Sequence, residues 1–187
     1  MKEGKIVDRV KIKIGNKEIE IVIRYPKKSD LTKIWKFYNK VIKETEFLSR
    51  FSPVSLKEEK KWLKDVFQKI KKKNLVYLLV EHEGRIVGST TVGREPEQSH
   101  LHEGVYGISI LQSYTGFGIG KKLTNHVISL AKKEMKLEII YLIIFGKNKI
   151  ARKFYRKIGF KYVGKIPKGV KRGKKYQDEI IMYKVLR

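Results

Sequence analysis

The sequence has no cysteine among its 187 residues, which excludes disulfides, zinc–thiolate sites and a cysteine nucleophile. This composition suits a reducing compartment, and we expect the protein in the cytoplasm. Prolines number only 4, and together with a hydrophobic content of 41% this argues against long disordered segments. No uninterrupted apolar run approaches the length that spans a bilayer, and residues 1–10 lack the apolar core of a signal peptide, so we expect no membrane association.

Acidic residues are scarce as well: 19 Asp and Glu stand against 44 Lys and Arg, which gives a net charge of +25. Such a charge can mark a surface for nucleic acid, the ribosome or an acidic substrate. It can equally reflect the Lys-rich composition of a whole proteome, as in some heat-loving organisms. The lysines lie on nearly every polar helical face rather than in one block, which favours the compositional origin. Non-specific, salt-sensitive binding to polyanions is expected in either case.

The hydrophobic pattern predicts one domain over residues 1–187, with residues 1–17 as an N-terminal strand extension. The predicted strands cover residues 5–14, 19–23, 75–81, 85–93, 101–111, 137–145, 161–166 and 176–186. A basic loop, residues 168–175, is expected between the last two. Four helices are predicted, beginning at Ser29 or Asp30, at Ser55, directly after the glycines of residues 116–120, and at Asn148.

Three glycines at alternate positions, Gly116, Gly118 and Gly120, follow the apolar run Val105–Leu111 and precede a helical pattern. Without a Cβ, glycine lets the backbone turn sharply and approach a ligand closely. The unpaired N–H groups of such a loop and of the first helical turn make a site for phosphate or pyrophosphate. This order of strand, glycine loop and helix is the strongest functional signal in the sequence.

Three other interpretations of this loop are a dinucleotide site, a nucleoside triphosphate site and a turn without a ligand. A dinucleotide-binding fold needs G-x-G-x-x-G, whereas the spacing here is G-x-G-x-G and no βα unit precedes it. A nucleoside triphosphate loop needs G-x-x-x-x-G-K-[ST], and Gly116 to Gly120 is too short for that motif. A glycine-rich turn without a ligand stays open on this stretch alone.

The loop resembles the acyl-CoA pyrophosphate loop of the GNAT superfamily of N-acetyltransferases, [QR]-x-x-G-x-[GA]. Gly118 and Gly120 take the two small positions, while Thr115 stands at the Gln/Arg position and departs from the pattern. A second stretch, residues 148–160, is similar to the N-x-x-A-x-x-x-Y-x-x-x-G-F motif that follows the fifth strand in these enzymes. Its matching positions are Asn148, Ala151, Tyr155, Gly159 and Phe160.

This resemblance implies an α/β (α+β) fold: a single domain with a central mixed, mostly antiparallel twisted sheet of about seven strands, flanked by four helices. It also implies direct transfer of an acetyl group from acetyl-CoA to a primary amine in a ternary complex, without a metal. A splay between two central strands admits the pantetheine arm in the family. The residues implied for acetyl-CoA binding are Ile108, Ser109, Ile110, Gly116, Phe117, Gly118, Ile119, Gly120, Lys121, Asn148 and Tyr155.

By the same resemblance, the main chain of Ile108–Ile110 pairs with the pantetheine arm, and an N–H near Ile110 polarises the thioester carbonyl. Asn148 hydrogen-bonds the pantetheine, although the residue also suits a helix cap. Tyr155 protonates the departing thiolate, because a phenol with a pKa near 10 carries its proton at neutral pH. A buried aromatic without a catalytic role is the alternative for Tyr155.

The general base is less clearly indicated. Several relatives carry a glutamate five residues before the Asn of the second motif, and Ile143 occupies that position here. The candidates for catalysis that remain are Glu103 and Glu46, and beside them His102, Glu44 and a chain of water molecules.

Residues 44–63 and 173–182 resemble the corresponding regions of phosphinothricin-type and related small-amine acetyltransferases, a group with relatives that act on ribosomal-protein N-termini. The acceptor amine, a small molecule or a protein, is not identified by this resemblance, and a homodimer stays open. Two alternatives to an enzyme remain: a basic nucleic-acid or ribosome-associated protein, and a CoA-binding sensor without turnover.

Overall fold

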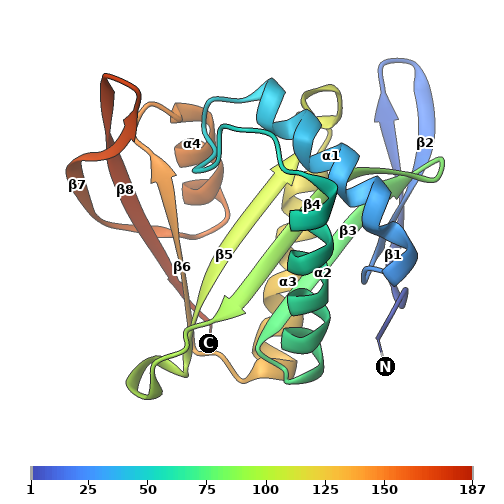
Figure 1. Ribbon diagram of the computed structural model, residues 1–187, viewed down its shortest axis with the longest axis horizontal. Helices are drawn as coiled ribbons and strands as arrows, with labels where there is room; N and C mark the ends of the chain where they lie inside the picture. Colours follow the sequence, from blue (N-terminus) through green and yellow to red (C-terminus); the bar gives the residue numbers. More distant parts are fainter. Residues whose placement is uncertain (1, 187) are drawn as a thin grey trace.

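In the computed structural model, which describes residues 2–186, one eight-stranded sheet runs through the whole molecule (Figure 1). The strands are β1 (Ile6–Ile14), β2 (Lys17–Arg24), β3 (Leu75–His82), β4 (Arg85–Arg94), β5 (Glu103–Ile110), β6 (Ile139–Phe145), β7 (Lys161–Arg172) and β8 (Lys175–Val185). Their order across the sheet is β1-β2-β3-β4-β5-β6-β8-β7. The helices are α1 (Leu31–Glu44), α2 (Leu56–Lys71), α3 (Ile119–Leu130) and α4 (Lys149–Lys157).

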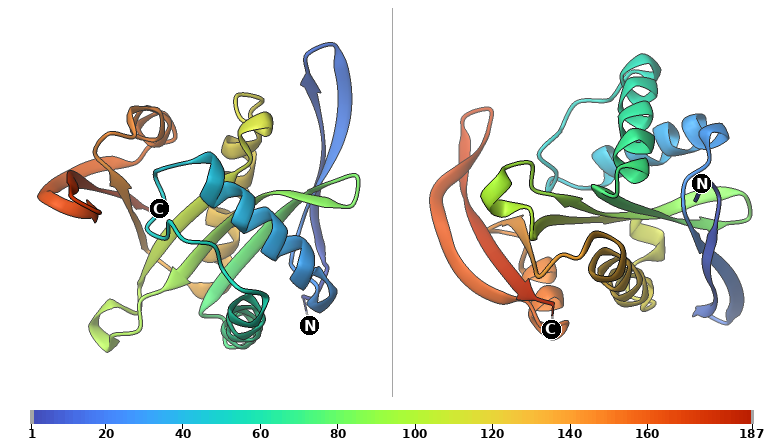
Figure 2. Two further views of the ribbon diagram at one scale, coloured as in Figure 1. Left: turned by 45° about the horizontal axis from the view of Figure 1, so that its top comes forward. Right: turned by 90° about the horizontal axis from the view of Figure 1, so that it is seen from below.

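The helices lie in two layers. Seen along the sheet, α1 and α2 cover one face, whereas α3 and α4 lie on the other (Figure 2). The central strand β3 is therefore buried on both sides, and its residues 76–80 are at most 2% exposed. This explains why β3 is a continuous apolar run instead of an alternating one. On the far face, Leu123 and Val127 of α3 are fully buried against the sheet.

The predicted architecture is confirmed: four helices flank a mixed, mostly antiparallel sheet, with eight strands in place of about seven. The N-terminal extension forms β1, which pairs only with β2 at one edge of the sheet. The basic segment 168–175 differs from the prediction, because most of it is strand. Two register shifts, one of them around Pro167, let β7 stay paired with β8 as far as Arg172. Proline is tolerated there because β7 is the edge strand and its backbone need not donate.

The start of α1 also differs from the prediction. Asp30 does not cap the helix; its buried carboxylate accepts hydrogen bonds from the Arg24 guanidinium at 2.7 and 2.9 Å and from the Lys27 N–H at 2.7 Å. Burial alone would raise the pKa of Asp30, but these hydrogen bonds outweigh it and lower the pKa. Asp30 therefore joins β2 to α1 as an ionised residue.

The feature that positions the site is the short pairing between β5 and β6, the parallel pair of the sheet. Only Glu103, Gly104 and Val105 of β5 pair with β6, yet β5 continues to Ile110 and β6 to Phe145. Beyond the paired ends the two strands diverge (Figure 1), while β6 stays paired with β8 along its whole length. The sheet is therefore split over half the length of β5.

Candidate active site

A cleft of about 1070 Å³ occupies the place where β5 and β6 part. One side is lined by α1, α2 and the connector between them, and the other by the glycine loop and α4. Its size is that of a site for a cofactor-sized ligand. The predicted cofactor-binding residues that line it are Ile108, Ser109, Ile110, Gly116, Gly118, Gly120, Lys121, Asn148 and Tyr155. Phe117 and Ile119 do not line the cleft: Phe117 packs against the core and Ile119 is 1% exposed within it.

The glycine loop presents a row of unused backbone donors. Gly116 and Gly118 have φ angles of +86° and +81°, a left-handed conformation that strains other residues. Gly118 is the N-cap of α3. Within residues 2–186, no hydrogen bond satisfies the backbone N–H groups of residues 116–121, and the first donor used after them is Lys122. Six consecutive donors at the positive end of a helix dipole can hold a pyrophosphate.

The entry to this loop is held by side chains from distant elements. A short 3₁₀ turn at Gln112–Tyr114 follows β5, and its first N–H donates to Glu44 at the end of α1 at 2.9 Å. The Tyr114 hydroxyl lies 2.8 Å from Nδ1 of His82 on β3. Thr115, at the position that departs from the family pattern, donates from its hydroxyl to the Gln112 carbonyl at 2.8 Å. Glu44, a candidate base in the sequence, thus supports the loop.

The edge of β5 that faces the cleft carries the main-chain groups of Ile108 and Ile110. In an antiparallel pair, successive residues direct their hydrogen-bonding groups to alternate sides. The Leu111 N–H donates to the Val87 carbonyl of β4, so the odd-numbered residues of β5 face β4 and the even-numbered ones face β6. Pairing with β6 ends at Val105, so the groups of Ile108 and Ile110 open onto the cleft.

Asn148 caps α4, as predicted: its Oδ1 accepts from the Ala151 N–H at 3.0 Å. The amide nitrogen of the same side chain makes no hydrogen bond within the described part of the chain, and Asn148 is one of the residues that line the cleft. Gly159, with a φ of +91°, ends the helix as a left-handed C′ residue. The motif of residues 148–160 is therefore a capped helix that carries its tyrosine into the cleft.

Tyr155 is 6% exposed and packs edge-on against Tyr106 and Phe160, with ring centroids 5.8 and 5.6 Å away. Burial raises the pKa of Tyr155 well above its ordinary value, and the charge of a neighbouring Tyr106 phenolate would add to the rise. Burial also raises the pKa of Tyr106, to about 12, although its hydroxyl is hydrogen-bonded to Thr124 at 2.8 Å. The Tyr155 hydroxyl makes no hydrogen bond among residues 2–186, which leaves its proton for a ligand.

The candidate bases do not gather in the cleft. Glu103 lies at the opposite end of β5, paired with Ile139, and seven residues of strand separate it from Ile110 by about 23 Å. Glu46 is exposed on the connector, where its neighbour Phe47 lines the cleft instead. His102 lies beside Glu103, with 3.5 Å between Nε2 and Oε1. Ile143 lines the cleft and is 48% exposed, so this wall of β6 is apolar.

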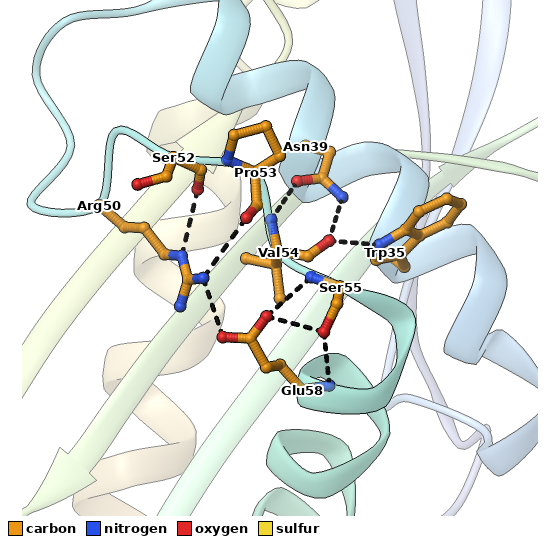
Figure 3. Close-up of polar contacts among 8 residues, drawn as sticks. All are labelled: Trp35, Asn39, Arg50, Ser52, Pro53, Val54, Ser55 and Glu58. Atoms are coloured by element: carbon orange, nitrogen blue, oxygen red, sulfur yellow. Dashed lines mark hydrogen bonds and ion pairs between the residues drawn. The ribbon is translucent and has the colours of Figure 1, made fainter.

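The connector between α1 and α2 forms the roof over one end of the cleft and is held in place by a polar network (Figure 3). The Asn39 side chain accepts from the Val54 N–H at 2.7 Å and donates to the Val54 carbonyl at 3.0 Å. Arg50 donates to Glu58 at 2.9 Å, and Glu58 forms a capping box with Ser55 at the start of α2. The network fixes a loop that would otherwise have few contacts.

Two carboxylates missed by sequence reasoning line this end of the cleft, Glu58 and Glu59. The available signal was the register of α2: Glu59 shares the inner face with Leu63 and Val66, an unusual position for a charged residue. Such a signal marks a buried carboxylate but gives no indication of what faces it.

The profile of the acetyltransferase (GNAT) family matches residues 37–160, which is most of the chain. The chain belongs to the GNAT acetyltransferase family. The matched segment runs from α1 through the glycine loop to the end of the second motif, so both motifs of this GNAT chain lie inside it.

Among curated GNAT relatives, N-alpha-acetyltransferase 50 of Danio rerio is 29% identical over 111 residues, covering 59% of this chain. The L-amino acid N-acetyltransferase of Escherichia coli K12 is 28% identical over 105 residues, covering 55%. The matched regions span 62% and 64% of those two proteins.

Solved structures share the GNAT fold. A GNAT-family acetyltransferase from Streptococcus pneumoniae superposes with a TM-score of 0.80 at 24% identity, over 89% of this chain and 99% of that one. A phosphinothricin acetyltransferase from Sinorhizobium meliloti, solved with acetyl-CoA, gives 0.76 at 18% identity over 89% and 88%. No helix within residues 2–186 is both long and apolar enough to cross a membrane.

Proposed function

We propose that the protein is an N-acetyltransferase that transfers an acetyl group from acetyl-CoA directly to a primary amine. The observation that carries this proposal is the row of six unused backbone donors at residues 116–121, which opens onto the same cleft as the parted strands. Family membership supports it, as does the presence of acetyl-CoA in the related Sinorhizobium enzyme.

The residues of the cleft fit this donor along its length. The N–H groups of the glycine loop would hold the pyrophosphate. The outward N–H and carbonyl of Ile108 and the carbonyl of Ile110 would pair with the pantetheine amides as an added strand would, and the Asn148 side-chain amide would donate from the opposite wall. When bound, acetyl-CoA supplies the acetyl group as a thioester.

Two groups of the chain act on the reacting atoms. The Ile110 N–H donates to the thioester carbonyl oxygen, where negative charge develops during attack by the amine. The Tyr155 hydroxyl donates its proton to the departing sulfur. A phenol with a raised pKa is a weak acid, but the burial around Tyr155 also raises the basicity of a thiolate held beside it, so the transfer stays feasible.

The acceptor must lose a proton before it attacks. Neither Glu103 nor Glu46 lines the cleft. Glu58 is held by Ser55 and Arg50, and Glu59 lies at the connector end, so we assign this step to water in the open cleft. Family membership does not identify the acceptor, because relatives are named for different acceptors. The Escherichia coli relative is named for L-amino acids, and a relative from Pseudomonas phage PaMx11 is named for 5-NmdU.

Calorimetric titration of acetyl-CoA tests the proposal, with CoA and ATP as controls and enough salt to suppress non-specific binding to the basic surface. We expect acetyl-CoA and CoA to bind in the micromolar range and ATP not to bind. Equal binding of all three, or none, would reduce the loop to a general anion site or a structural turn. The basic surface would then favour a nucleic-acid-binding role.

A further inference from the structure

Two adjacent carboxylates on α2, both in the wall of the cleft, differ in what they contact. The Glu58 carboxylate accepts from the Ser55 N–H and hydroxyl, both at 2.8 Å, and from Arg50 at 2.9 Å (Figure 3). The Glu59 side chain has no hydrogen bond or ion pair within residues 2–186, and the residue is only 3% exposed. Its carboxylate is not fully enclosed, since Arg152 Nε is the one enclosed side-chain polar atom without a partner in that range, and Glu59 lines the cleft. A buried carboxylate without a partner is costly, and proteins rarely keep one without a use.

Three aromatic side chains, Tyr38, Trp62 and Tyr77, line the same end of the cleft as Glu59. Trp62, one helical turn further along α2, meets Tyr77 of β3 edge-on with ring centroids 5.4 Å apart. Burial raises the pKa of Glu59, with Arg50 acting in the opposite direction. Burial also raises the pKa values of Tyr38 and Tyr77, and the charge of Glu59 adds to both rises. A carboxylate among aromatic faces is a site for an organic cation.

The sheet register gives the distance from this site to the reacting end of the cleft. Tyr77 pairs with Thr91 of β4, and Thr91 pairs with Gly107 of β5, so the three residues form one row across the cleft floor. Neighbouring strands lie about 4.8 Å apart, which puts Tyr77 about 10 Å from β5. The floor between them is small and polar, because Ser89, Thr91, Gly107 and Ser109 all line it. Extended aliphatic chains fit such a floor.

We propose that Glu59 is the anchor for a second cationic group of the acceptor, and that the acceptor is a flexible diamine or polyamine. One amine reacts beside Ile110, three residues further along β5 than Gly107, while the other ammonium pairs with Glu59 beside the rings of Trp62 and Tyr77. Two strand spacings across the sheet and three residues along β5 separate the two amines by about 14 Å. This rests on the proposed acetyl transfer and specifies its substrate class. The net charge of +25 repels cations from the protein as a whole, so selection of a dication requires a local carboxylate of this kind.

The test compares 1,10-diaminodecane, whose extended chain matches this separation, with decylamine, which has the same chain but one cationic group. Binding of each is measured by calorimetry with and without CoA, in the wild-type protein and in the Glu59→Gln and Asp65→Asn variants. Asp65 is the matched control, because it removes the same charge from an exposed position of α2 outside the cleft. We expect the wild type and Asp65→Asn to bind the diamine at least tenfold more tightly, and Glu59→Gln to bind both amines within about threefold of each other.

Thermal unfolding separates a ligand site from a structural role. Since no group within residues 2–186 pairs with Glu59, the glutamine variant should melt at or above the wild-type temperature. A lower melting temperature together with weaker binding of both amines would make Glu59 structural and overturn the inference. So would a wild-type protein that does not distinguish the two amines. If the diamine preference depends on Glu59 but acetyl-CoA does not bind, the cation site stands and the proposed acetyl transfer fails.

Discussion

The two ends of the cleft are built in different ways. The end at the glycine loop is made of main-chain groups, donated by consecutive residues in one loop and one helical turn. The end under the α1–α2 connector is made of side chains from α1, α2 and β3, held by hydrogen bonds between residues far apart in the chain. The first kind of site binds what every family member shares, and the second can change its ligand with a few substitutions. The difference suggests where each end will be sensitive to mutation.

Gly118→Val should have the largest effect on binding, and the effect should be limited to the glycine-loop end of the cleft. A β-branched residue at a φ of +81° is strained, and its side chain would enter the open space in front of the donors. We expect acetyl-CoA binding to be lost in calorimetry. Gly15→Val is the control, since Gly15 has a φ of +59° and equally open surroundings but lies in the β1–β2 turn. Equal loss of binding in both variants would mean that general strain, and not the site, is responsible.

Tyr155→Phe should affect chemistry and leave both ends of the cleft intact. Because its hydroxyl has no partner in the described chain, we expect unchanged stability and acetyl-CoA affinity. Turnover with any accepted amine should fall about 10²- to 10⁴-fold, the usual contribution of a general acid. Tyr141→Phe, which removes a hydroxyl bonded to Glu95 outside the cleft, should keep its turnover. Full turnover in Tyr155→Phe would remove its acid role.

Asn39→Ala should damage the connector end alone. It leaves the Val54 N–H without its partner, at a cost of about 1–3 kcal/mol in the free energy of unfolding, while the Val54 carbonyl keeps the hydrogen bond from the Trp35 indole at 2.7 Å. We expect the KM for the amine to rise several-fold while the Kd for acetyl-CoA stays constant. Asn125→Ala, on the exposed face of α3, serves as the control. A parallel loss of affinity for both substrates would show that the two ends are not independent.

Ser55→Ala should give the smallest effect. The hydroxyl caps α2 through the Glu58 N–H at 3.2 Å, and loss of such a cap costs about 1 kcal/mol. For a chain of this size, we expect the melting temperature to fall by about 2–4 °C. The amine KM should change less than in Asn39→Ala, because Arg50 still holds Glu58. A larger change in KM than that of Asn39→Ala would make the cap, not the Asn39 clamp, the main support of the connector.

The same contrast explains what the sequence could predict. Gly118 and Asn148 were identified because a positive φ and a helix cap need particular residue types at fixed spacings along the chain. The two-sided burial of β3 was readable from its apolar run. Glu59 was not identified, because its role depends on Trp62 and Tyr77, and only the fold brings Tyr77 to α2. Glu103 and Glu46 were chosen for their chemistry, and nothing in their local sequence reveals that one lies about 23 Å along a strand from Ile110 and the other points to solvent.

The three-residue pairing between β5 and β6 also links thermal stability to metabolism. Beyond Val105, β5 and β6 are not paired with each other. A ligand that lies between them therefore binds the folded protein, and its site does not exist in the unfolded chain. At a hundred times its Kd, such a ligand stabilises the fold by about 2.7 kcal/mol. The lifetime of this protein against heat and proteolysis should therefore rise and fall with the supply of its acyl donor.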